Sequence, residues 1–489
     1  MIIPLATQSY KSKALPLSSE RTVNFYAERE PPDAKTQIAI FGAPGLTNFA
    51  TCGTGPVRGM WTLAGVLYVV SGPTLYSVST AGISTPVGGA ISGNGVVAMS
   101  DNGTQLIIVN GVNGYIYSVA NGFQVITSSN FHPATSVTFF DNYFILSWDG
   151  TNKFFISASL DGTTYNGLDF ASAEVSPDNV LAVVNQQENL LIFGQKSIET
   201  WYDAGTVNFP FQRIDGGTIE RGCAAALSPV KEDNSVFFLG DDLVFYRLDG
   251  TIPRRISTHA LEDAWQRYST VADAYTFSYT FEGHKFIVLT FPTANATWVH
   301  DISTGLWHER DSVDMNNNSF GRWRGSGVPN LSSVYGKILV GDAYSGVVWY
   351  IDGTTYTEGG NTMRGLMVSP VISDPDRKRV FHNRYELDIE QGVGNTGPGS
   401  DNRVYHNPYE PDTVDPGSDP QIMLSWSDDG GRIFKPMQLW HSMGKLGAYR
   451  KRLRWLRMGQ ARNRVYALTV SDPVRRTIIA SSADLSVGL

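Results

Sequence analysis

Short apolar segments separated by tight polar turns recur along most of the chain. One unit repeats: an apolar segment, a turn containing Gly, Asn or Asp, a second segment rich in Tyr or Trp, and then Gly. Because Gly, Asn and Asp tolerate the positive φ of hairpin turns, each copy predicts a β-hairpin. The copies lie roughly 40–50 residues apart, which is the repeat length of propeller blades. They begin at Val66, Gln105, Tyr143, Asn189, Ser235, Lys285 and Lys337.

This repeat predicts a β-propeller. A lone hairpin cannot bury both of its faces, so the copies must share a core, and closing them into a circle removes exposed sheet edges. Further short strands, such as 96–100 and 180–184, would complete four-stranded blades. We expect six or seven blades over 21–360, after an N-terminal arm at 1–20. A two-sheet sandwich with long meanders is the competing architecture, but it gives no reason for seven equivalent copies.

One helix interrupts the strand pattern. Residues 259–268 place Leu261, Ala264, Trp265 and Tyr268 on one stripe, as the helical period requires, and Thr258 can cap the helix. We expect this helix to decorate a blade.

The pattern changes near residue 361. Residues 391–420 are rich in Gly, Pro, Asn and Asp and nearly lack apolar residues. A loop of this length inside a compact unit is usually functional or disordered. Strand-like segments flank it on both sides, so 361–489 is predicted to be a C-terminal β-sandwich-like domain.

Composition narrows the class of protein. The chain has 489 residues, 42% hydrophobic and only 17% charged, with 49 Gly. These values exclude whole-chain disorder, coiled coil and collagen. We expect no membrane-spanning segment and no secretory leader, because no apolar run approaches the ~20 residues of a spanning helix. The two cysteines, Cys52 and Cys223, predict neither a disulfide framework nor a zinc site.

Charge is distributed unevenly along the chain. Residues 361–489 hold 18 Lys and Arg against 14 Asp and Glu, a net charge of +4 in a chain whose total is −8. Residues 445–464 contain no acidic residue, which suggests a contact surface for a polyanion or an acidic subunit, unless they form a merely solvated strand face. Its basic residues are Lys445, Arg450, Lys451, Arg452, Arg454, Arg457, Arg462 and Arg464.

The spacing of this basic segment indicates an extended strand. On such a strand Arg450, Arg452 and Arg454 would project from one face, while Leu453 and Trp455 would pack on the other. A row of guanidinium groups can neutralise phosphates without reading base sequence. It can equally pair with carboxylates of a neighbouring subunit.

Enzyme signatures are absent. The sequence has no phosphate-binding loop, no H-E-x-x-H and no G-x-S-x-G element. A G-x-G-x-x-G match starting at Gly392 is followed by Pro398, so the helix that this fingerprint needs cannot begin there. The loose pair His300 and His308 is more typical of structural histidines than of a metal site. We therefore predict no catalytic residues, no metal and no cofactor.

Residues 427–434 match the Asp box of sialidases, S-x-D-x-G-x-x-F, through Ser427, Asp429, Gly431 and Phe434. In those proteins the box stabilises a turn away from the chemistry. The match therefore predicts a hairpin and does not predict hydrolase activity.

The N-terminal sequence resembles that of a known family. Residues 19–30 match an R-x-V-N-x-Y-x-E element, and Pro44, Gly45 and Leu46 match a P-G-L element. Further similar stretches, including 194–205, 283–292 and 444–473, follow in collinear order. Together they resemble the tail nozzle proteins of short-tailed bacteriophages, also called packaged-DNA stabilisation proteins or tail accessory factors.

This resemblance implies a structural virion protein of the phage tail, assembled in the host cytoplasm, without enzymatic activity. Family members form a ring, usually a hexamer, at the distal end of the portal–adaptor channel. The ring retains packaged DNA and passes it at ejection. Its implied partners are further copies of itself, the tail adaptor or head-to-tail connector, and needle, spike or fibre proteins. Packaged double-stranded DNA would lie close to it without being read.

The resemblance carries over residue by residue to the N-terminal elements. We expect these positions to serve the fold and ring assembly: Arg21, Asn24, Tyr26, Glu28, Pro44 and Gly45.

The basic segment is interpreted as meeting a subunit or the adaptor in preference to DNA, because a strongly basic channel wall would grip DNA and hinder its ejection. The alternative functions are a receptor- or carbohydrate-binding propeller of the virion and, less favoured, a glycosidase.

Overall fold

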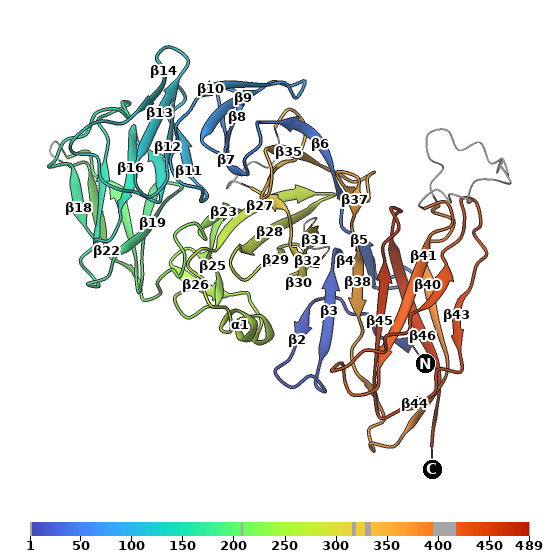
Figure 1. The fold of residues 1–489 in the computed structure, drawn as a ribbon. Coiled ribbons are helices and arrows are strands. Elements are labelled where there is room, and N and C mark those ends of the chain that lie inside the picture. Colours follow the sequence, from blue (N-terminus) through green and yellow to red (C-terminus); the bar gives the residue numbers. More distant parts are fainter. Residues whose placement is uncertain (1, 207–208, 315–318, 328–333, 395–416, 489) are drawn as a thin grey trace.

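The computed structural model describes residues 2–206, 209–314, 319–327, 334–394 and 417–488. Within these ranges the chain is built of strands, with a single helix, α1 (His259–Trp265). Figure 1 shows two bodies side by side, a propeller and a smaller sandwich. No helix in the described ranges is long and apolar enough to cross a bilayer.

The first four blades of the propeller are four-stranded antiparallel sheets. Blade 1 is β7 (Val57–Leu63), β8 (Val66–Ser71), β9 (Thr74–Val78) and β10 (Ser84–Gly88); blade 2 is β11 (Ala98–Asp101), β12 (Gln105–Val109), β13 (Gly114–Ser118) and β14 (Gly122–Val125). Blade 3 is β15 (Val137–Phe140), β16 (Tyr143–Trp148), β17 (Lys153–Ile156) and β18 (Phe170–Ser172); blade 4 is β19 (Val180–Gln186), β20 (Asn189–Gly194), β21 (Ile198–Asp203) and β22 (Phe211–Ile219).

The remaining blades follow the same order. Blade 5 is β23 (Val230–Glu232), β24 (Ser235–Leu239), β25 (Phe245–Asp249) and β26 (Ile252–Arg255); blade 6 is β27 (Tyr275–Phe281), β28 (His284–Phe291), β29 (Ala296–Asp301) and β30 (Trp307–Glu309). Blade 7 is β33 (Gly325–Ser326), β34 (Leu339–Asp342), β35 (Val347–Asp352) and β6 (Gly45–Thr51). A separate hairpin, β31 (Asp311–Asp314) and β32 (Ser319–Arg322), follows blade 6.

The seven repeats of the sequence are the middle hairpins of the blades. The first repeat, from Val66, forms β8 and β9, and the last, from Lys337, forms β34 and β35. The prediction of a propeller with a sandwich-like domain is confirmed, and the described residues form seven blades.

The propeller is closed by strands from distant parts of the chain. β6 pairs antiparallel with β35, from Gly45 opposite Asp352 to Thr51 opposite Val347. Blade 7 therefore takes its outermost strand from the N-terminal region, just before blade 1 begins. This pairing ties the two ends of the circle together without a covalent link.

The core of the propeller is divided among the gaps between blades. In the described chain, each adjacent pair of blades encloses one buried apolar cluster. Between blades 1 and 2, for example, Val70, Leu75, Leu106 and Ile108 are fully buried. Burial of such a side chain is worth about 1.5–3 kcal/mol, so the circle is stabilised locally at every gap.

The sandwich consists of two sheets. One runs in the order β4-β5-β46-β40-β43, and the other continues blade 6 in the order β30-β3-β38-β45-β41-β42. Its core includes Tyr385, Leu424, Trp455 and Tyr466. The main strands are β3 (Ser19–Val23), β4 (Phe25–Arg29), β5 (Ile38–Gly42), β38 (Gly365–Val368), β40 (Val380–Ile389), β41 (Gln421–Ser427), β42 (Leu439–Ser442), β43 (Leu453–Leu456), β45 (Asn463–Val470) and β46 (Thr477–Val487).

Short strands complete both bodies. Those at the sandwich are β1 (Ile2–Ile3), β2 (Tyr10–Lys11), β39 (Ile372–Ser373) and β44 (Gln460–Ala461), and those beside β6 are β36 (Thr357–Glu358) and β37 (Asn361–Thr362). Residues 395–416 of the predicted loop 391–420 lie outside the described residues.

The N-terminal region differs from the prediction. Residues 1–20 were expected to form an arm and the propeller to begin at 21, yet β1, β4 and β5 belong to a sandwich sheet and β3 to the other. Phe25, Ala27 and Ile40 are buried in the sandwich core. Alternating apolar residues predict a half-buried strand, but the pattern does not say which sheet the strand joins.

The predicted helix is confirmed as α1, but its predicted cap is not formed. Thr258 stands at the N-cap position without a side-chain capping bond, and its buried Oγ1 has no partner in the part of the chain that the structure describes. Instead Ser257 Oγ donates to Glu262 Oε1 at 2.7 Å, and Arg255 pairs with Glu262 at 2.6 Å. Leu261 and Trp265 are buried between blades 5 and 6.

Candidate functional site

The basic segment lies at one edge of the sandwich. β43 pairs with β40 and forms the end of its sheet in the described chain. Leu453 and Trp455 are buried while Arg454 is exposed, as the alternation predicted. The strand is shorter than expected, however: Arg450 lies in a turn, and Arg452 precedes β43 in an extended segment without ladder pairing.

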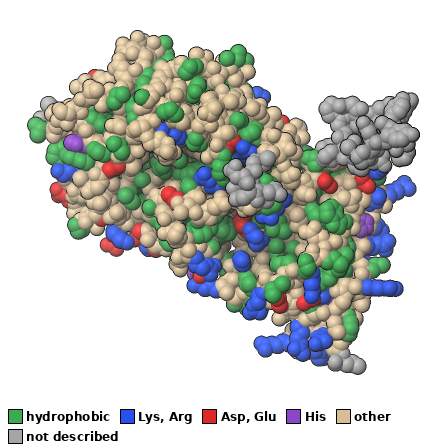
Figure 2. Space-filling view, in the orientation of Figure 1, with side chains coloured by type: hydrophobic (Ala, Val, Ile, Leu, Met, Phe, Trp, Pro, Cys, Tyr) green, Lys and Arg blue, Asp and Glu red, His purple; other side chains and the backbone are tan. Residues whose placement is uncertain are grey.

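Seven of the eight predicted basic residues are exposed, and we call them the basic face. Figure 2 shows Lys and Arg side chains gathered along the edge of the C-terminal domain. The basic face consists of Lys445, Arg450, Lys451, Arg452, Arg454, Arg457 and Arg462.

Among the residues that the structure describes, most cations of the basic face have no ion-pair partner. Arg452 forms a salt bridge with Glu386 at 2.7 Å. No other member has an ion pair with a residue that the structure describes. Exposed charges without partners are free to meet charges of another molecule.

Arg464 does not belong to the basic face, which corrects the prediction. Its side chain is 1% exposed, its Nε bonds Asp428 Oδ1 at 2.7 Å and its Nη1 donates to the Met458 carbonyl at 2.7 Å. Its guanidinium also lies near the rings of Trp426 and Tyr466. Arg464 is on β45, a central strand, so burial and ion pairing make it a structural residue.

Large apolar side chains stand exposed beside the basic face, and the sequence analysis missed them. Trp440 on β42 is 60% exposed, and Tyr449 is 70% exposed, with Leu446 and Leu456 also open to solvent. β42 lies next to β43, since Trp455 Nε1 donates to the Leu439 carbonyl at 3.2 Å. Exposed aromatic and aliphatic groups interleaved with arginine are typical of the centre of protein–protein interfaces. No periodicity marks them, because exposure depends on packing.

The Asp-box match forms the predicted turn. Asp429 Oδ1 accepts hydrogen bonds from the backbone N–H groups of Arg432 and Ile433 at 2.9 and 3.0 Å. Gly430 and Gly431 both have positive φ, of 75° and 91°. The box therefore stabilises a loop, as interpreted from the sequence.

The residues of the N-terminal elements come together at the junction of the two bodies. β3 pairs antiparallel with β38 of the sandwich and, through Val23 and Glu309, parallel with β30 of blade 6. Arg21 forms a salt bridge with Glu309 at 2.6 Å, and this carboxylate raises the pKa of Arg21. One continuous sheet thus crosses from propeller to sandwich.

Asn24 is the turning point between β3 and β4. Its φ of 53° lies in the left-handed region, which Asn tolerates better than most residues. Its Nδ2 donates to Asp311 Oδ1 at 2.7 Å and to the Arg364 carbonyl at 2.8 Å. Asp311 in turn forms a salt bridge with Arg364 at 2.6 Å. The side chain of Asn24 therefore links three segments that are far apart in sequence.

Tyr26 and Glu28 of β4 reach blade 6. Tyr26 Oη donates to Glu282 Oε2 at 3.1 Å, and Glu28 Oε2 lies 3.7 Å from His284 Nε2. His284 Nδ1 lies 2.8 Å from Asp301 Oδ2, and this hydrogen bond raises the pKa of His284. Tyr26 and Glu28 are thus contacts between the two bodies.

Pro44 and Gly45 lie where the chain enters β6. The Pro44 carbonyl accepts a hydrogen bond from Arg310 Nη2 at 3.1 Å. A Cβ at Gly45 would stand 2.4 Å from the Thr355 carbonyl oxygen, so no larger residue fits there without a backbone shift. The two elements that carry the family resemblance therefore build the joint between the two bodies.

A second buried network stands between blades 6 and 7. The fully buried Arg310 guanidinium lies 4.1 Å from the Trp323 ring centroid, and Trp323 Nε1 donates to Glu358 Oε1 at 2.9 Å. Burial raises the pKa of Glu358 to about 6. Among the described groups the buried Arg310 Nε has no hydrogen-bond partner, while Arg310, Trp323 and Glu358 contact one another in the packed core.

The described ranges contain no group of three or more His, Cys, Asp or Glu that could hold a metal ion. Burial lowers the pKa of His300 to about 4 and that of His308 to about 3. His300 packs against the Trp307 ring, and His308 against Phe286. Both histidines are therefore neutral core residues near neutral pH.

Comparison with known families covers nearly the whole chain. A family described as bacteriophage P22 Gp10, beta-propeller, matches residues 1–356, and one described as bacteriophage P22 Gp10, beta-sandwich, matches residues 366–486. No curated protein matches this chain.

Solved structures show only distant similarity. The extracellular domain of a putative hybrid two-component system from B. thetaiotaomicron is 9% identical, with a TM-score of 0.42, over 71% of this chain and 45% of that one. The N-terminal domain of Nup159 is 11% identical, with a TM-score of 0.38, over 68% and 99%. The Myceliophteria thermophila Cps50 (Swd1) propeller domain is 10% identical, with a TM-score of 0.39, over 63% and 99%. This chain spans less than half of the extracellular domain of that two-component system.

Proposed function

The chain belongs to the bacteriophage P22 Gp10 family, and from this premise we propose that it forms the ring-shaped tail nozzle. A role in the structure and stabilisation of the phage tail follows from the family itself. In more detail, we propose that six copies of the chain form a ring at the end of the portal–adaptor channel. The ring would retain packaged DNA and pass it at ejection.

The basic face supports a protein partner for this edge of the sandwich. A DNA-facing wall needs cations alone, whereas this edge combines unpaired cations with exposed Trp440 and Tyr449. Such apolar groups gain free energy when another protein covers them. We therefore place the basic face against a neighbouring subunit or the tail adaptor, with DNA as the less favoured occupant.

A ring also requires that one surface of each copy fit a different surface of the next. The chain has the charge asymmetry for such a contact, because residues 361–489 are net positive within a chain of net charge −8. The continuous sheet at the junction would hold the two surfaces of each copy in a constant relation.

The wider set of partners follows from the proposed position. The adaptor would lie on one side of the ring, and needle, spike or fibre proteins on the other. Assembly would take place in the host cytoplasm, and the mature location would be the virion tail. DNA would pass close to the ring without being read.

Replacement of Arg450, Arg452 and Arg454 by Ser tests this assignment. We expect the purified variant to remain folded but to lose assembly on a portal–adaptor complex, as followed by cryo-electron microscopy or sedimentation. A matched control replaces Lys196 and Arg254, exposed cations of the propeller, by Ser. If particles assemble normally but leak DNA, the basic face contacts DNA instead. A chain found at the periphery with blade loops pointing outward would favour receptor binding.

A further inference from the structure

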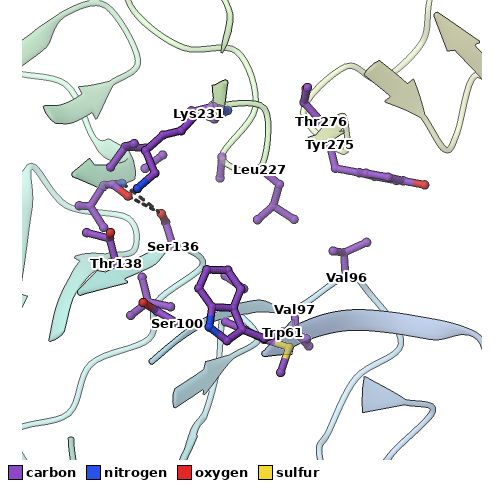
Figure 3. A pocket seen from close by; sticks show the side chains of 18 of the residues that line it. Trp61, Val96, Val97, Ser100, Ser136, Thr138, Leu227, Lys231, Tyr275 and Thr276 are labelled. Carbon is purple, nitrogen blue, oxygen red and sulfur yellow. Dashed lines mark hydrogen bonds between the residues drawn. The ribbon is translucent and has the colours of Figure 1, made fainter. Parts of the chain in front are cut away.

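The axis of the propeller contains a cavity that the nozzle proposal does not use. Its volume is about 230 Å³, and all seven blades contribute to its lining. The contributors include Trp61, Thr138, Asn185, Lys231 and Tyr275, on or near the innermost strands. Figure 3 shows Trp61, Thr138, Lys231 and Tyr275 around an open space.

The two sides of this cavity differ in chemistry. Lys231, Thr138, Ser136 and Ser100 lie on one side in Figure 3. Apolar groups lie opposite, among them Leu227, Val96 and Val97, with the Trp61 ring at the base of the view. The cavity is therefore amphipathic.

The polar side is organised around one amide oxygen. Asn185 Oδ1 accepts from Lys231 Nζ at 2.6 Å and from Thr138 Oγ1 at 3.0 Å. Asn185 Nδ2 donates to the Phe139 carbonyl at 3.0 Å, which fixes the amide in this orientation. Lys231 is thus held in place at the cavity wall.

Lys231 lacks an anionic partner. Its ammonium has three donors, and within the described chain no carboxylate lies at ion-pair distance from it. Burial lowers the pKa of Lys231. The buried ammonium group of Lys231 would be stabilised by an anion that accepts its remaining hydrogen bonds.

The one acidic residue of the lining is already engaged. Asp101 Oδ1 accepts from Trp61 Nε1 at 2.8 Å, and Oδ2 accepts from the Gly103 amide at 2.8 Å. The buried hydroxyl of Thr276, which also lines the cavity, has no partner among the described groups. The cavity thus offers the ammonium group of Lys231 together with an apolar wall.

We infer that the axial cavity binds a small amphipathic anion, with its carboxylate or equivalent head group at Lys231 and its apolar body along Leu227, Val96 and Trp61. This inference rests on the cavity alone and is independent of the nozzle proposal.

Isothermal titration of the full chain with octanoate tests the inference. We expect saturable binding that is at least about tenfold weaker in Lys231→Met, because a hydrogen bond to a charged group is lost while the apolar stem is kept. Lys153→Met, a propeller lysine outside the cavity lining, should bind octanoate like the original chain. Thermal melting monitors the folding of both variants.

A ligand series makes the test independent of the variants. Octylamine has the same apolar body with a cationic head, and it should bind the unaltered chain at least about tenfold more weakly than octanoate. Absence of saturable octanoate binding would overturn the inference. So would equal binding of octanoate and octylamine, or an unchanged affinity in folded Lys231→Met.

Discussion

The propeller and the sandwich treat their surface charges differently. On the propeller, exposed cations are largely paired locally: Lys196 with Asp241 at 3.2 Å, Arg255 with Glu262 at 2.6 Å and Arg267 with Asp263 at 2.6 Å. On the sandwich, the basic face has one such pair among the described residues. The propeller therefore satisfies its own charges, whereas the sandwich leaves charges available to a partner.

The arginines of the sandwich sharpen this contrast. Arg464 and Arg454 are ten residues apart in sequence, yet one is buried in an ion pair and the other is exposed. The same residue type thus serves the fold in one place and is free for contact in the other.

The largest loss of stability is expected when the buried Arg464 is replaced. Arg464→Met removes the closer of the two cations that pair with Asp428, leaving Lys435 at 3.6 Å, and removes the side-chain donor to the Met458 carbonyl. We expect the free energy of unfolding to fall by about 3 kcal/mol, because two hydrogen bonds made by a buried charged group are lost. Urea unfolding followed by tryptophan fluorescence measures it. A loss below about 1 kcal/mol would contradict the structural role of Arg464.

The second largest loss of stability is expected at the joint between the two bodies. Asn24→Ala removes hydrogen bonds to Asp311 and Arg364 and places Ala at a φ of 53°. We expect a loss of about 2–3 kcal/mol, because buried polar groups lose their donor and the backbone is strained. Calorimetry should show this loss. Asn24→Asp, which tolerates the same φ but cannot donate, separates the two causes.

Acid should destabilise both bodies through their buried neutral histidines. His300 and His308 in blade 6 have pKa values of about 4 and about 3, while His382 is the sandwich histidine with a pKa lowered to about 4. Since the unfolded chain protonates these groups near pH 6.5 and the folded chain does not, stability falls as the pH drops from 6.5 towards 4.

Each of these histidines contributes a slope of up to about 1.4 kcal/mol per pH unit. His284 does not offset this slope, because its raised pKa stabilises the fold fully below pH 6.5. Glu358 does offset about one histidine between pH 6 and 4.5, because its raised pKa of about 6 lets the folded chain bind this proton before the unfolded chain does. Melting curves between pH 7 and 4.5 measure the effect. Replacement of His308 by Phe should reduce the slope, and an unchanged slope would argue against a buried neutral His308.

The smallest effect on stability is expected at the basic face. Arg454→Ser should change the free energy of unfolding by no more than about 0.5 kcal/mol, because the side chain is exposed and has no ion pair among the described residues. Its unfolding curve should therefore overlay that of the unaltered chain. If Arg454→Ser clearly destabilised the protein, Arg454 would serve the fold as Arg464 does, and the distinction between the two arginines would be wrong.

The sequence predicted much of the architecture but only part of the candidate site. The hairpins from Val66 to Lys337 were predictable because turn residues and apolar runs act locally. The alternation of Leu453, Arg454 and Trp455 was predictable for the same reason. The burial of Arg464 and the exposure of Trp440 were not, because each depends on which strands pack across the sandwich.

The sequence by itself determined the all-β class, the seven hairpins and the position of the basic segment, since period and turn chemistry are properties of neighbouring residues. Only the tertiary structure decided that β3, β4 and β5 join the sandwich and that β6 closes the propeller. Only the tertiary structure brought Arg21, Asn24 and Glu28 to a single joint. Strand partners are chosen by shape and burial between segments hundreds of residues apart, and no local pattern encodes that choice.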